Sequence, residues 1–375
     1  MRLGEEIVSV DNLPPAKIGM IGAGFMGQHA HLENYSAIPE CQVVALAELR
    51  PELRRRVAER YEIPRTYATH EELLSDPDVQ AVVAVTARPV TGPIALDCLM
   101  AGKHLLTEKP MASTVAQSER LVSEASSRDL IYSVGYMRRH DEGIQKAKAM
   151  LDELVRTGEL GAITFVRMHC FAGDDYCNID GHVVTDETVP EGQADWPLAP
   201  EWLPSERWGD YAYFLNVFCH NINLLRHLLD RTPSVEFVRF ENPNARLAVF
   251  DFGGYRAVLE AGQSTSRTWD EVTEIYFENG RMRIEAPPAL LRNVPARVEL
   301  FRADQRQEIV EPQSDWTWAF RRQAQAFVTD LRESRAPLAS GADAVEDMKT
   351  MEAMWRMEVE RVPMEKLSPG GRRDT

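Results

Sequence analysis

Short apolar runs alternate with amphipathic segments along the first third of the chain. The nearly continuous apolar runs occupy residues 18–21, 43–47, 79–85, 104–106 and 130–134. Segments with helical spacing lie between them, at 28–37, 51–61, 71–74, 94–100 and 113–127. Strands without polar alternation are typical of parallel sheets that are buried on both faces. The alternation of strand and helix therefore predicts a doubly wound α/β domain over residues 16–136, with ligands at the carboxyl ends of its strands.

The pattern changes in the second part of the chain. After a predicted helix at 140–157, short β-type runs are broken by Asn-Pro, Gly-Gly and Asn-Gly turns, which favours an antiparallel sheet. These runs are 163–171, 235–240, 247–261, 272–278, 281–285 and 297–301. The remaining segments are a long loop at 172–208, a helix at about 210–229, and terminal helices at 315–334 and 341–361. We predict an N-terminal Rossmann domain over 1–137 and a C-terminal α+β domain over 138–375 with a large, mainly antiparallel sheet.

The first apolar run leads directly into a glycine-rich turn. Gly22, Gly24 and Gly27 have the spacing G-x-G-x-x-G between a predicted strand and a predicted helix. In that context the first glycine allows a tight turn, the second lets backbone approach a pyrophosphate, and the third lets helix and strand pack closely. Glu48 ends the second run about 20 residues further on, where an acid binds the ribose of NAD. An ordinary glycine-rich turn would not need this acid, so we predict dinucleotide binding.

The charge and cysteine content narrow the functional classes. The 375 residues include 42 basic and 58 acidic ones, a net charge of −16, so we expect no nucleic-acid partner, which would need a basic surface. The five cysteines are scattered without a C-x-x-C pair, which favours reduced thiols in a cytoplasmic protein. We find neither a signal-type N-terminus nor an apolar run of about 18 residues, so we expect no membrane partner.

A stripe of polar side chains runs along the predicted helix of the second domain. Asn216, His220, Asn223 and His227 are spaced so that they share one face. Neutral hydrogen-bonding groups on a mostly apolar helix indicate a polar cavity; the alternative is a half-solvated helix with incidental polar residues. No H-x-x-x-H pair presents two metal ligands here, so we expect no metal.

Lys109 and the long loop add further candidates. Lys109 follows the fourth apolar run on the cofactor side of the first domain, where a nearby nicotinamide cation would lower the pKa of a lysine. A solvated loop lysine is the alternative. The loop contains Asp174, Asp175, Tyr176, His182, Trp196, Trp202 and Trp208. Tryptophan faces and carboxylates suit sugars, but we favour the interpretation that the tryptophans anchor the loop or a subunit contact.

With these motifs in place, the chain resembles the Gfo/Idh/MocA oxidoreductase family over roughly residues 16–362. The resemblance rests on G-A-G-F-M-G at 22–27, A-G-K-H-L-L-T-E-K-P at 101–110, V-G-Y-M-R-R-H-D at 134–141 and R-T-G-E-L-G-A-I at 156–163. It implies hydride transfer between NAD(P) and a secondary hydroxyl or ketone of a sugar, aminosugar or cyclitol. Lys109 would orient and polarise the reacting oxygen, and His220 would take or give the hydroxyl proton.

The resemblance also implies binding residues and an assembly. The cofactor-binding residues would be Gly22, Gly24, Phe25, Met26, Gly27, Glu48, Thr86, Ala87, Glu108 and Lys109. The substrate-binding residues would be Arg139, Asn216, His220 and Asn223. We expect NAD because Glu48 would repel a 2′-phosphate, although NADP is also compatible, since Arg50 and Arg54 are close in sequence. Family members pair through this sheet, and the mixed pattern at 247–261 fits a homodimer or homotetramer.

Two departures from the family pattern leave the substrate open. The family commonly has D-x-x-x-H-x-x-D on the helix, where this chain has Asn216, His220 and Asn223. Without a carboxylate partner we expect His220 to stay neutral at pH 7. The frequent T-P-N-x-x-H is Thr86-Ala-Arg-Pro-Val-Thr91 here. Two alternatives therefore remain beside the dehydrogenase: an NAD-recycling non-redox enzyme for glycoside cleavage or elimination, and a catalytically silent NAD-binding regulator.

Overall fold

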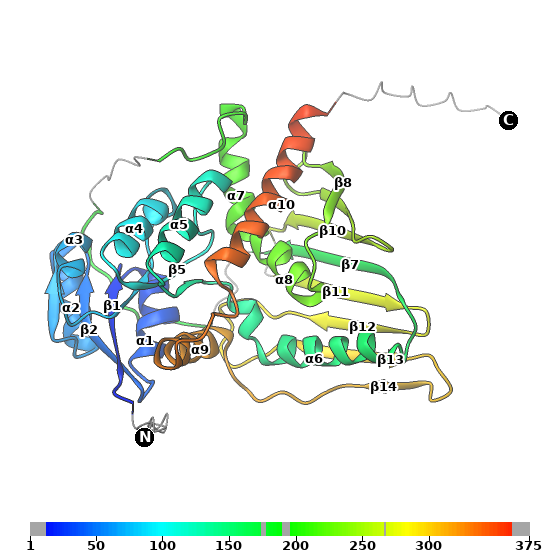
Figure 1. Cartoon of the computed structure of the whole chain (residues 1–375), viewed down its shortest axis with the longest axis horizontal. Helices are drawn as coiled ribbons and strands as arrows, with labels where there is room; N and C mark the ends of the chain where they lie inside the picture. The colour runs from blue at the N-terminus through cyan, green and yellow to red at the C-terminus, as the bar shows by residue number, and fades with distance from the viewer. Residues whose placement is uncertain (1–12, 174–177, 190–195, 266–267, 362–375) are drawn as a thin grey trace, which may run out of the picture.

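Two β-sheets lie side by side, and helices cover them (Figure 1). The computed structural model describes residues 13–173, 178–189, 196–265 and 268–361. The first sheet has six parallel strands in the order β3-β2-β1-β4-β5-β6, and the second has eight in the order β14-β13-β12-β11-β7-β10-β9-β8. In the second sheet β7 and β10 pair in parallel and the other pairs are antiparallel. The predicted α/β class, with a parallel and a mainly antiparallel sheet, is confirmed.

The first sheet and its helices follow the predicted alternation closely. The strands are β1 (Ala16–Ile21), β2 (Cys41–Ala47), β3 (Arg65–Tyr67), β4 (Ala81–Ala84), β5 (His104–Thr107) and β6 (Tyr132–Val134). The helices are η2 (Gly27–Leu32), α1 (Glu33–Tyr35), α2 (Pro51–Arg60), α3 (His70–Leu74), α4 (Arg88–Met100), α5 (Val115–Ser127) and η3 (Met137–His140). The short strand β3 was not predicted, and α4 begins six residues before the predicted helix at 94–100.

Apolar side chains on the two faces of the first sheet enter different clusters. Ile18, Met20 and Val83 pack with side chains of η2, α1 and α2, whereas Val82 and Leu105 pack with α3, α4 and α5. Burial on both faces explains why these strands have unbroken apolar runs. Because the strands are parallel, their carboxyl ends all lie along one edge of the sheet.

The second domain is built around the mixed sheet. Its strands are β7 (Ile163–Ala172), β8 (Ser234–Arg239), β9 (Arg246–Asp251), β10 (Arg256–Gln263), β11 (Trp269–Phe277), β12 (Gly280–Glu285), β13 (Arg297–Arg302) and β14 (Glu308–Val310). Its helices are α6 (Glu142–Thr157), η4 (Ser205–Arg207), α7 (Trp208–Val217), α8 (Cys219–Leu229), α9 (Ala319–Glu333) and α10 (Gly341–Glu360). The helix predicted at 210–229 is thus two helices separated at Phe218, and the run 247–261 is a hairpin of β9 and β10.

Helices cover one face of the second sheet, and the last two helices reach back to the first domain. α6 contacts β12 and β13, and α8 contacts β7 (Figure 1). The division predicted after residue 137 places α9 in the second domain, but Ala324, Phe327 and Val328 of α9 share a core cluster with Ile18 of β1. α10 packs against both α5 and β8, so it joins the two domains. Within the described ranges, no helix has the length and apolar character needed to cross a membrane.

Candidate active site

The glycine turn after β1 leaves room for a ligand at one position and none at the other two. Gly22 has a φ of +90°, and a Cβ there would lie 2.2 Å from the carbonyl oxygen of Val85. A Cβ on Gly27 would lie 2.5 Å from the carbonyl oxygen of Gly22. A Cβ on Gly24 would meet nothing within 4 Å, so this backbone borders open space. This geometry fits a tight turn, close helix packing and backbone approach to a pyrophosphate.

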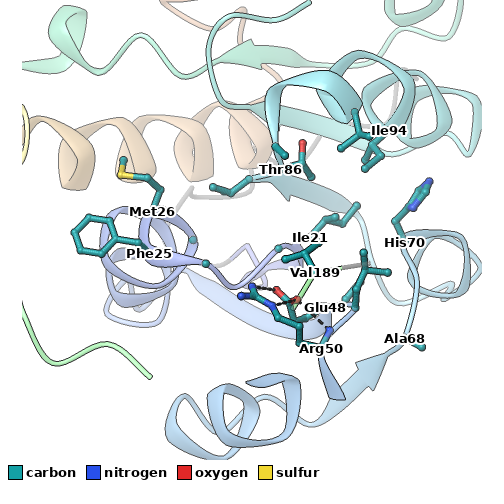
Figure 2. A pocket seen from close by; sticks show the side chains of 18 residues that line it. Ile21, Phe25, Met26, Glu48, Arg50, Ala68, His70, Thr86, Ile94 and Val189 are labelled. Carbon is teal, nitrogen blue, oxygen red and sulfur yellow. Dashed lines mark hydrogen bonds and ion pairs between the residues drawn. The ribbon is translucent and has the colours of Figure 1, made fainter. Parts of the chain in front are cut away.

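A cavity of about 420 Å³ opens beside this turn, and we call it the glycine-turn cavity (Figure 2). Eight residues predicted to bind the cofactor line it: Gly22, Gly24, Phe25, Met26, Gly27, Glu48, Thr86 and Ala87. Apolar side chains such as Ile21, Val85 and Ile94 form much of the remaining wall. An apolar slot with one carboxylate and an open backbone edge suits an adenosine and its phosphates.

Glu48, at the carboxyl end of β2, is the buried acid of this cavity. Its Oε2 accepts a hydrogen bond from the N–H of Ala23 at 2.9 Å. Its Oε1 accepts one from Nε of Arg50 at 2.8 Å, and Figure 2 shows this pair. Burial alone would raise the pKa of Glu48, but the bonds from Arg50 and Ala23 lower it overall. Glu48 is therefore a carboxylate at neutral pH, and it lines the cavity.

A second, larger cavity of about 740 Å³ continues from the first, and we call it the lysine–histidine cavity. The two cavities share Phe25, Met26, Val85 and Thr86 in their walls. Lys109 and Glu108 of the first domain line the second cavity, as do Asn216 and His220 of the second domain. Both predicted catalytic residues therefore face one space that adjoins the predicted cofactor groove.

Lys109 is held at the end of helix α7. Its Nζ donates to the backbone oxygen of Asn216 at 2.7 Å and to the Oδ1 of Asn216 at 3.2 Å. Asn216 is the second-last residue of α7, so its carbonyl lies at the negative end of the helix dipole. The break between α7 and α8 at Phe218 leaves this carbonyl available to the ammonium group. Lys109 is thereby aimed at the cavity by a contact between the domains.

His220 lies on α8, opposite the domain that carries Lys109. Burial lowers the pKa of His220 well below its usual value, and the charges of Lys109 and Arg138 lower it further. Its ring packs edge-on against Tyr136 with centroids 6.1 Å apart. Among the described residues its Nδ1 has no hydrogen-bond partner. The imidazole is therefore neutral at pH 7, because burial and the two nearby cations disfavour its charged form.

A buried histidine that sequence reasoning missed supports the wall beside Lys109. Nε2 of His31, on η2, lies 2.8 Å from Oε1 of Glu108, and the N–H of Lys109 donates to Oε2 of Glu108 at 3.2 Å. Burial would raise the pKa of Glu108, but His31 and then Lys109 lower it overall. His31 is four residues beyond the glycine turn on the predicted helix, but no spacing rule links it to Glu108.

A polar cluster on the second sheet was also missed. Glu271 of β11 pairs with Arg138, accepts a bond from Nε1 of Trp269 at 3.0 Å and one from Nδ2 of Asn221 at 3.3 Å. All four residues line the lysine–histidine cavity, and Arg138 and Glu271 are each only 3% exposed. The sequence pattern did not single these residues out. Glu271 lies within a strand that carries no motif, and Arg138 is next to another arginine, Arg139.

Two residues predicted to bind substrate lie elsewhere. Nε of Arg139 donates to Oδ1 of Asn223 at 2.8 Å, and Nδ2 of Asn223 donates to Oδ2 of Asp347 at 2.7 Å. Arg226 and Asp343 complete this buried network between α8, α10 and η3. Neither Arg139 nor Asn223 lines the cavity. The reason is local geometry: the tight turn of η3 presents Arg138 to the cavity, and the break at Phe218 lets α8 present Asn221 instead.

The candidates in the long loop act mainly as anchors. His182 packs edge-on against Phe25, Trp196 lies beneath the guanidinium of Arg120, and Trp202 lies beneath that of Arg356. Nε1 of Trp208 donates to the backbone oxygen of Leu203 at 3.1 Å. None of these four side chains lines the lysine–histidine cavity, which agrees with the anchoring interpretation. Asp174, Asp175 and Tyr176 lie outside the described residues.

Comparison with known proteins identifies the first domain. Residues 16–136 match the sequence model of an oxidoreductase family with an NAD-binding Rossmann fold, named GFO_IDH_MocA. Over these residues the chain is similar to the Gfo/Idh/MocA oxidoreductase family. The matched residues form most of the first domain, and the open backbone at Gly24 beside the carboxylate of Glu48 fits the NAD cofactor of such a fold.

The proteins to which the chain is similar include cyclitol dehydrogenases. The chain is 28% identical to myo-inositol 2-dehydrogenase of Thermotoga maritima over 177 residues, 46% of this chain and 52% of that protein. The matched region thus spans about half the length of that relative. The chain is also 25% identical to inositol 2-dehydrogenase of Burkholderia cenocepacia, over 84% of this chain and 86% of that protein.

The fold of this chain is also that of solved dehydrogenase structures. A levoglucosan dehydrogenase in complex with NADH and levoglucosan superposes with a TM-score of 0.72 and 19% identity. The superposition covers 92% of this chain and 97% of that one. At this identity the likeness establishes the shared two-domain fold.

Proposed function

We propose that the chain is an NAD-dependent dehydrogenase that acts on a secondary hydroxyl, or the matching ketone, of a sugar, aminosugar or cyclitol. The observation that carries this proposal is that Lys109 and His220, from different domains, line one cavity that continues the glycine-turn cavity. The names of the similar proteins, inositol 2-dehydrogenase and levoglucosan dehydrogenase, support the same class of substrate.

The two residues would have complementary tasks. NAD, when bound, supplies the hydride acceptor. The Nζ of Lys109, aimed by Asn216, would donate a hydrogen bond to the reacting oxygen and orient it. The neutral imidazole of His220 would accept the hydroxyl proton, because burial and the nearby cations disfavour its charged form before the reaction. This arrangement favours the oxidation of an alcohol.

The cluster on β11 supports a polyol ring as the substrate. Glu271 and Asn221 present oxygen acceptors, and the indole of Trp269 lies beside them in the cavity wall. Carboxylates and amides pair well with hydroxyl groups, and an aromatic face suits the C–H surface of a ring. We therefore assign substrate binding to Asn216, Asn221, Arg138 and Glu271.

The open face of the second sheet supports a homodimer or homotetramer. Phe165 and Phe301 are each 37% exposed on this face, beside charged partners such as Arg167 and Glu260. We propose that two copies pair through it. Light scattering that gives only a 42.4 kDa species at micromolar concentration would refute the pairing. We also propose a cytoplasmic location, since the four described cysteines are free thiols.

A crystal structure with NAD and a bound polyol tests the proposed function. We expect the polyol to lie in the lysine–histidine cavity, with one hydroxyl within hydrogen-bond distance of both Lys109 and His220. Glu271 or Asn221 should contact a second hydroxyl. A polyol bound outside this cavity, or bound with no hydroxyl near Lys109, would contradict the assignment.

A further inference from the structure

A segment of the second domain lies across the Rossmann domain beside the cofactor groove. We call residues 178–189 the strap; they lie between β7 and α7 in the chain. Nε2 of Gln28, next to the glycine turn, donates to the backbone oxygen of Val183 at 2.9 Å, and the N–H of Val183 donates back to Oε1 of Gln28 at 2.8 Å. Gln28 is fully buried, so the strap is fixed at the turn.

The strap delivers a carboxylate to the start of helix α2. Oε1 of Glu187 accepts a hydrogen bond from the N–H of Glu52 at 2.9 Å, and Oε2 accepts one from the N–H of Leu53, also at 2.9 Å. Thr185 donates its hydroxyl to Oε2 of Glu187 at 2.9 Å. These backbone N–H groups are the ones that otherwise bind phosphate at a helix N-terminus. Glu187 therefore occupies an anion position with the protein's own carboxylate.

This position adjoins the place where the adenosine ribose binds. Glu48, at the end of β2, lies where an acid contacts the ribose 2′-hydroxyl, and Arg50 is the residue directly before α2. Both Oε atoms of Glu48 accept hydrogen bonds from the guanidinium of Arg50. The bond to Glu48 raises the pKa of Arg50 most, and the charge of Glu187 raises it further. Val189, at the end of the strap, lines the same cavity (Figure 2).

NADP-binding Rossmann domains use a nearby arginine for the 2′-phosphate, and helix N–H groups are a second means of binding a phosphate. Here Arg50 is paired with Glu48 and is also attracted by the charge of Glu187, and the N–H groups of Glu52 and Leu53 are occupied. We propose that Glu187 is a specificity-determining residue that, together with Glu48, excludes the 2′-phosphate of NADP and selects NAD. The inference rests on the proposed use of a nicotinamide cofactor, but not on the identity of the substrate.

Cofactor titration without substrate tests this role. The variants are Glu187→Gln and Glu187→Ala, and the matched control is Asp186→Asn, which removes the same charge from the exposed neighbouring residue. We expect the ratio of the NADP Kd to the NAD Kd to fall by about tenfold in both Glu187 variants, because the repulsion is removed and two N–H groups become free. The ratio should stay unchanged in Asp186→Asn.

A pair of small probes isolates the 2′-phosphate. Adenosine 2′,5′-bisphosphate should gain affinity in Glu187→Gln relative to adenosine 5′-phosphate, and Thr185→Ala, which frees the carboxylate from one contact, should give a smaller change of the same sign. A purely structural cap would instead lower the melting temperature and weaken both cofactors equally, which would overturn the proposal. An altered Kd ratio in a protein without dehydrogenase activity would reject the proposed function and retain this inference.

Discussion

The glycine-turn cavity and the lysine–histidine cavity adjoin each other, but they are built in different ways. The first is formed largely by segments that follow β1, β2 and β4, three neighbouring parallel strands. Backbone and apolar side chains form most of the wall of this first cavity. The second draws on η3, α7, α8 and β11, which are far apart in the chain. One cavity is thus a product of local sequence, and the other is a product of tertiary packing.

The two cavities also differ in whether their polar side-chain atoms already have hydrogen-bond partners. In the glycine-turn cavity both oxygens of Glu48 are hydrogen-bonded. In the lysine–histidine cavity, Nδ1 of His220, Oδ1 of Asn221 and Nε of Arg138 have no hydrogen-bond partner within the described part of the chain. Leaving buried polar groups without partners costs free energy that a bound ligand can recover. We therefore expect the second cavity to favour a polar ligand.

The largest effect is expected at Lys109. Lys109→Ala should lower kcat by ~10²–10⁴, the range for loss of a positioned proton-transfer group, while the Kd for NAD stays near the wild-type value. His220→Ala should behave similarly. Steady-state kinetics and cofactor titration measure the two quantities. Lys349→Ala, an exposed lysine on α10, is the control. Near-full kcat in either cavity variant would show that its assigned role is wrong.

A change at Arg139, which lies outside both cavities, should affect the stability of the fold rather than the reaction. Arg139→Met removes a buried guanidinium from its contacts with Asn223 and Asp343, and we expect the free energy of unfolding to fall by about 2 kcal/mol because the buried Asn223 and the half-buried Asp343 each lose a partner. Denaturant unfolding measures this loss. The same change at the exposed Arg156 should alter stability by less than about 0.5 kcal/mol. If Arg139→Met instead raises the substrate KM with unchanged stability, the original assignment of Arg139 to substrate binding is restored.

A smaller effect on catalysis is expected at Glu271, and Glu271→Gln should also lower the free energy of unfolding because it weakens the buried pair with Arg138. Glu271→Gln keeps the shape of the side chain but weakens its hydrogen bonds to substrate hydroxyls, so kcat/KM should fall by about 10- to 100-fold. The Kd for NAD should not change, because Glu271 lies outside the glycine-turn cavity. Glu236→Gln on β8, where the glutamate pairs with Arg256 at the surface, is the matched control. Equal losses for NAD and substrate would mean that the two cavities are not separable.

The smallest predicted effect is a shift in a pH profile. The pKa of His220 is well below the usual histidine pKa of 6.5. The imidazole is therefore neutral at pH 7 and becomes protonated only in more acidic solution. Asn216→Asp adds a negative charge that stabilises the imidazolium, so the acid limb of the kcat/KM profile should move to higher pH by about one unit. Gln325→Glu on the exposed side of α9 should leave the profile unchanged. Superimposable profiles for wild type and Asn216→Asp would show that Asn216 does not act on His220.

The fold could be predicted nearly whole because apolar periodicity reports local structure. The elements that were missed or wrongly placed are those for which the local sequence pattern contains no information. Strands β3 and β14 have three residues each, too few for a pattern. The break at Phe218 falls inside an unbroken helical pattern of the sequence. The attachment of α9 to the first sheet depends on which core its apolar face meets, and periodicity contains no such information.

The candidate site divides in the same way. The glycines and Glu48 could be located from spacing alone, because the turn that binds phosphate is a contiguous motif. The choice between Arg138 and Arg139 depends on a single tight turn in η3, and adjacent arginines give no periodic signal. Glu271 and its partners could not be found from sequence because the burial of a strand position depends on the helices that cover the sheet.

The measurement that tests the central claim most directly is NADH formation with a panel of sugars, aminosugars and cyclitols. The protein and NAD are mixed with each compound in turn, and NADH fluorescence is followed in wild type and in Lys109→Ala. The account predicts sustained NADH formation over many turnovers with at least one ring polyol, and its loss in the variant. Tight NAD binding without NADH formation from any compound, or product formation without net NADH, would contradict the assignment of a dehydrogenase.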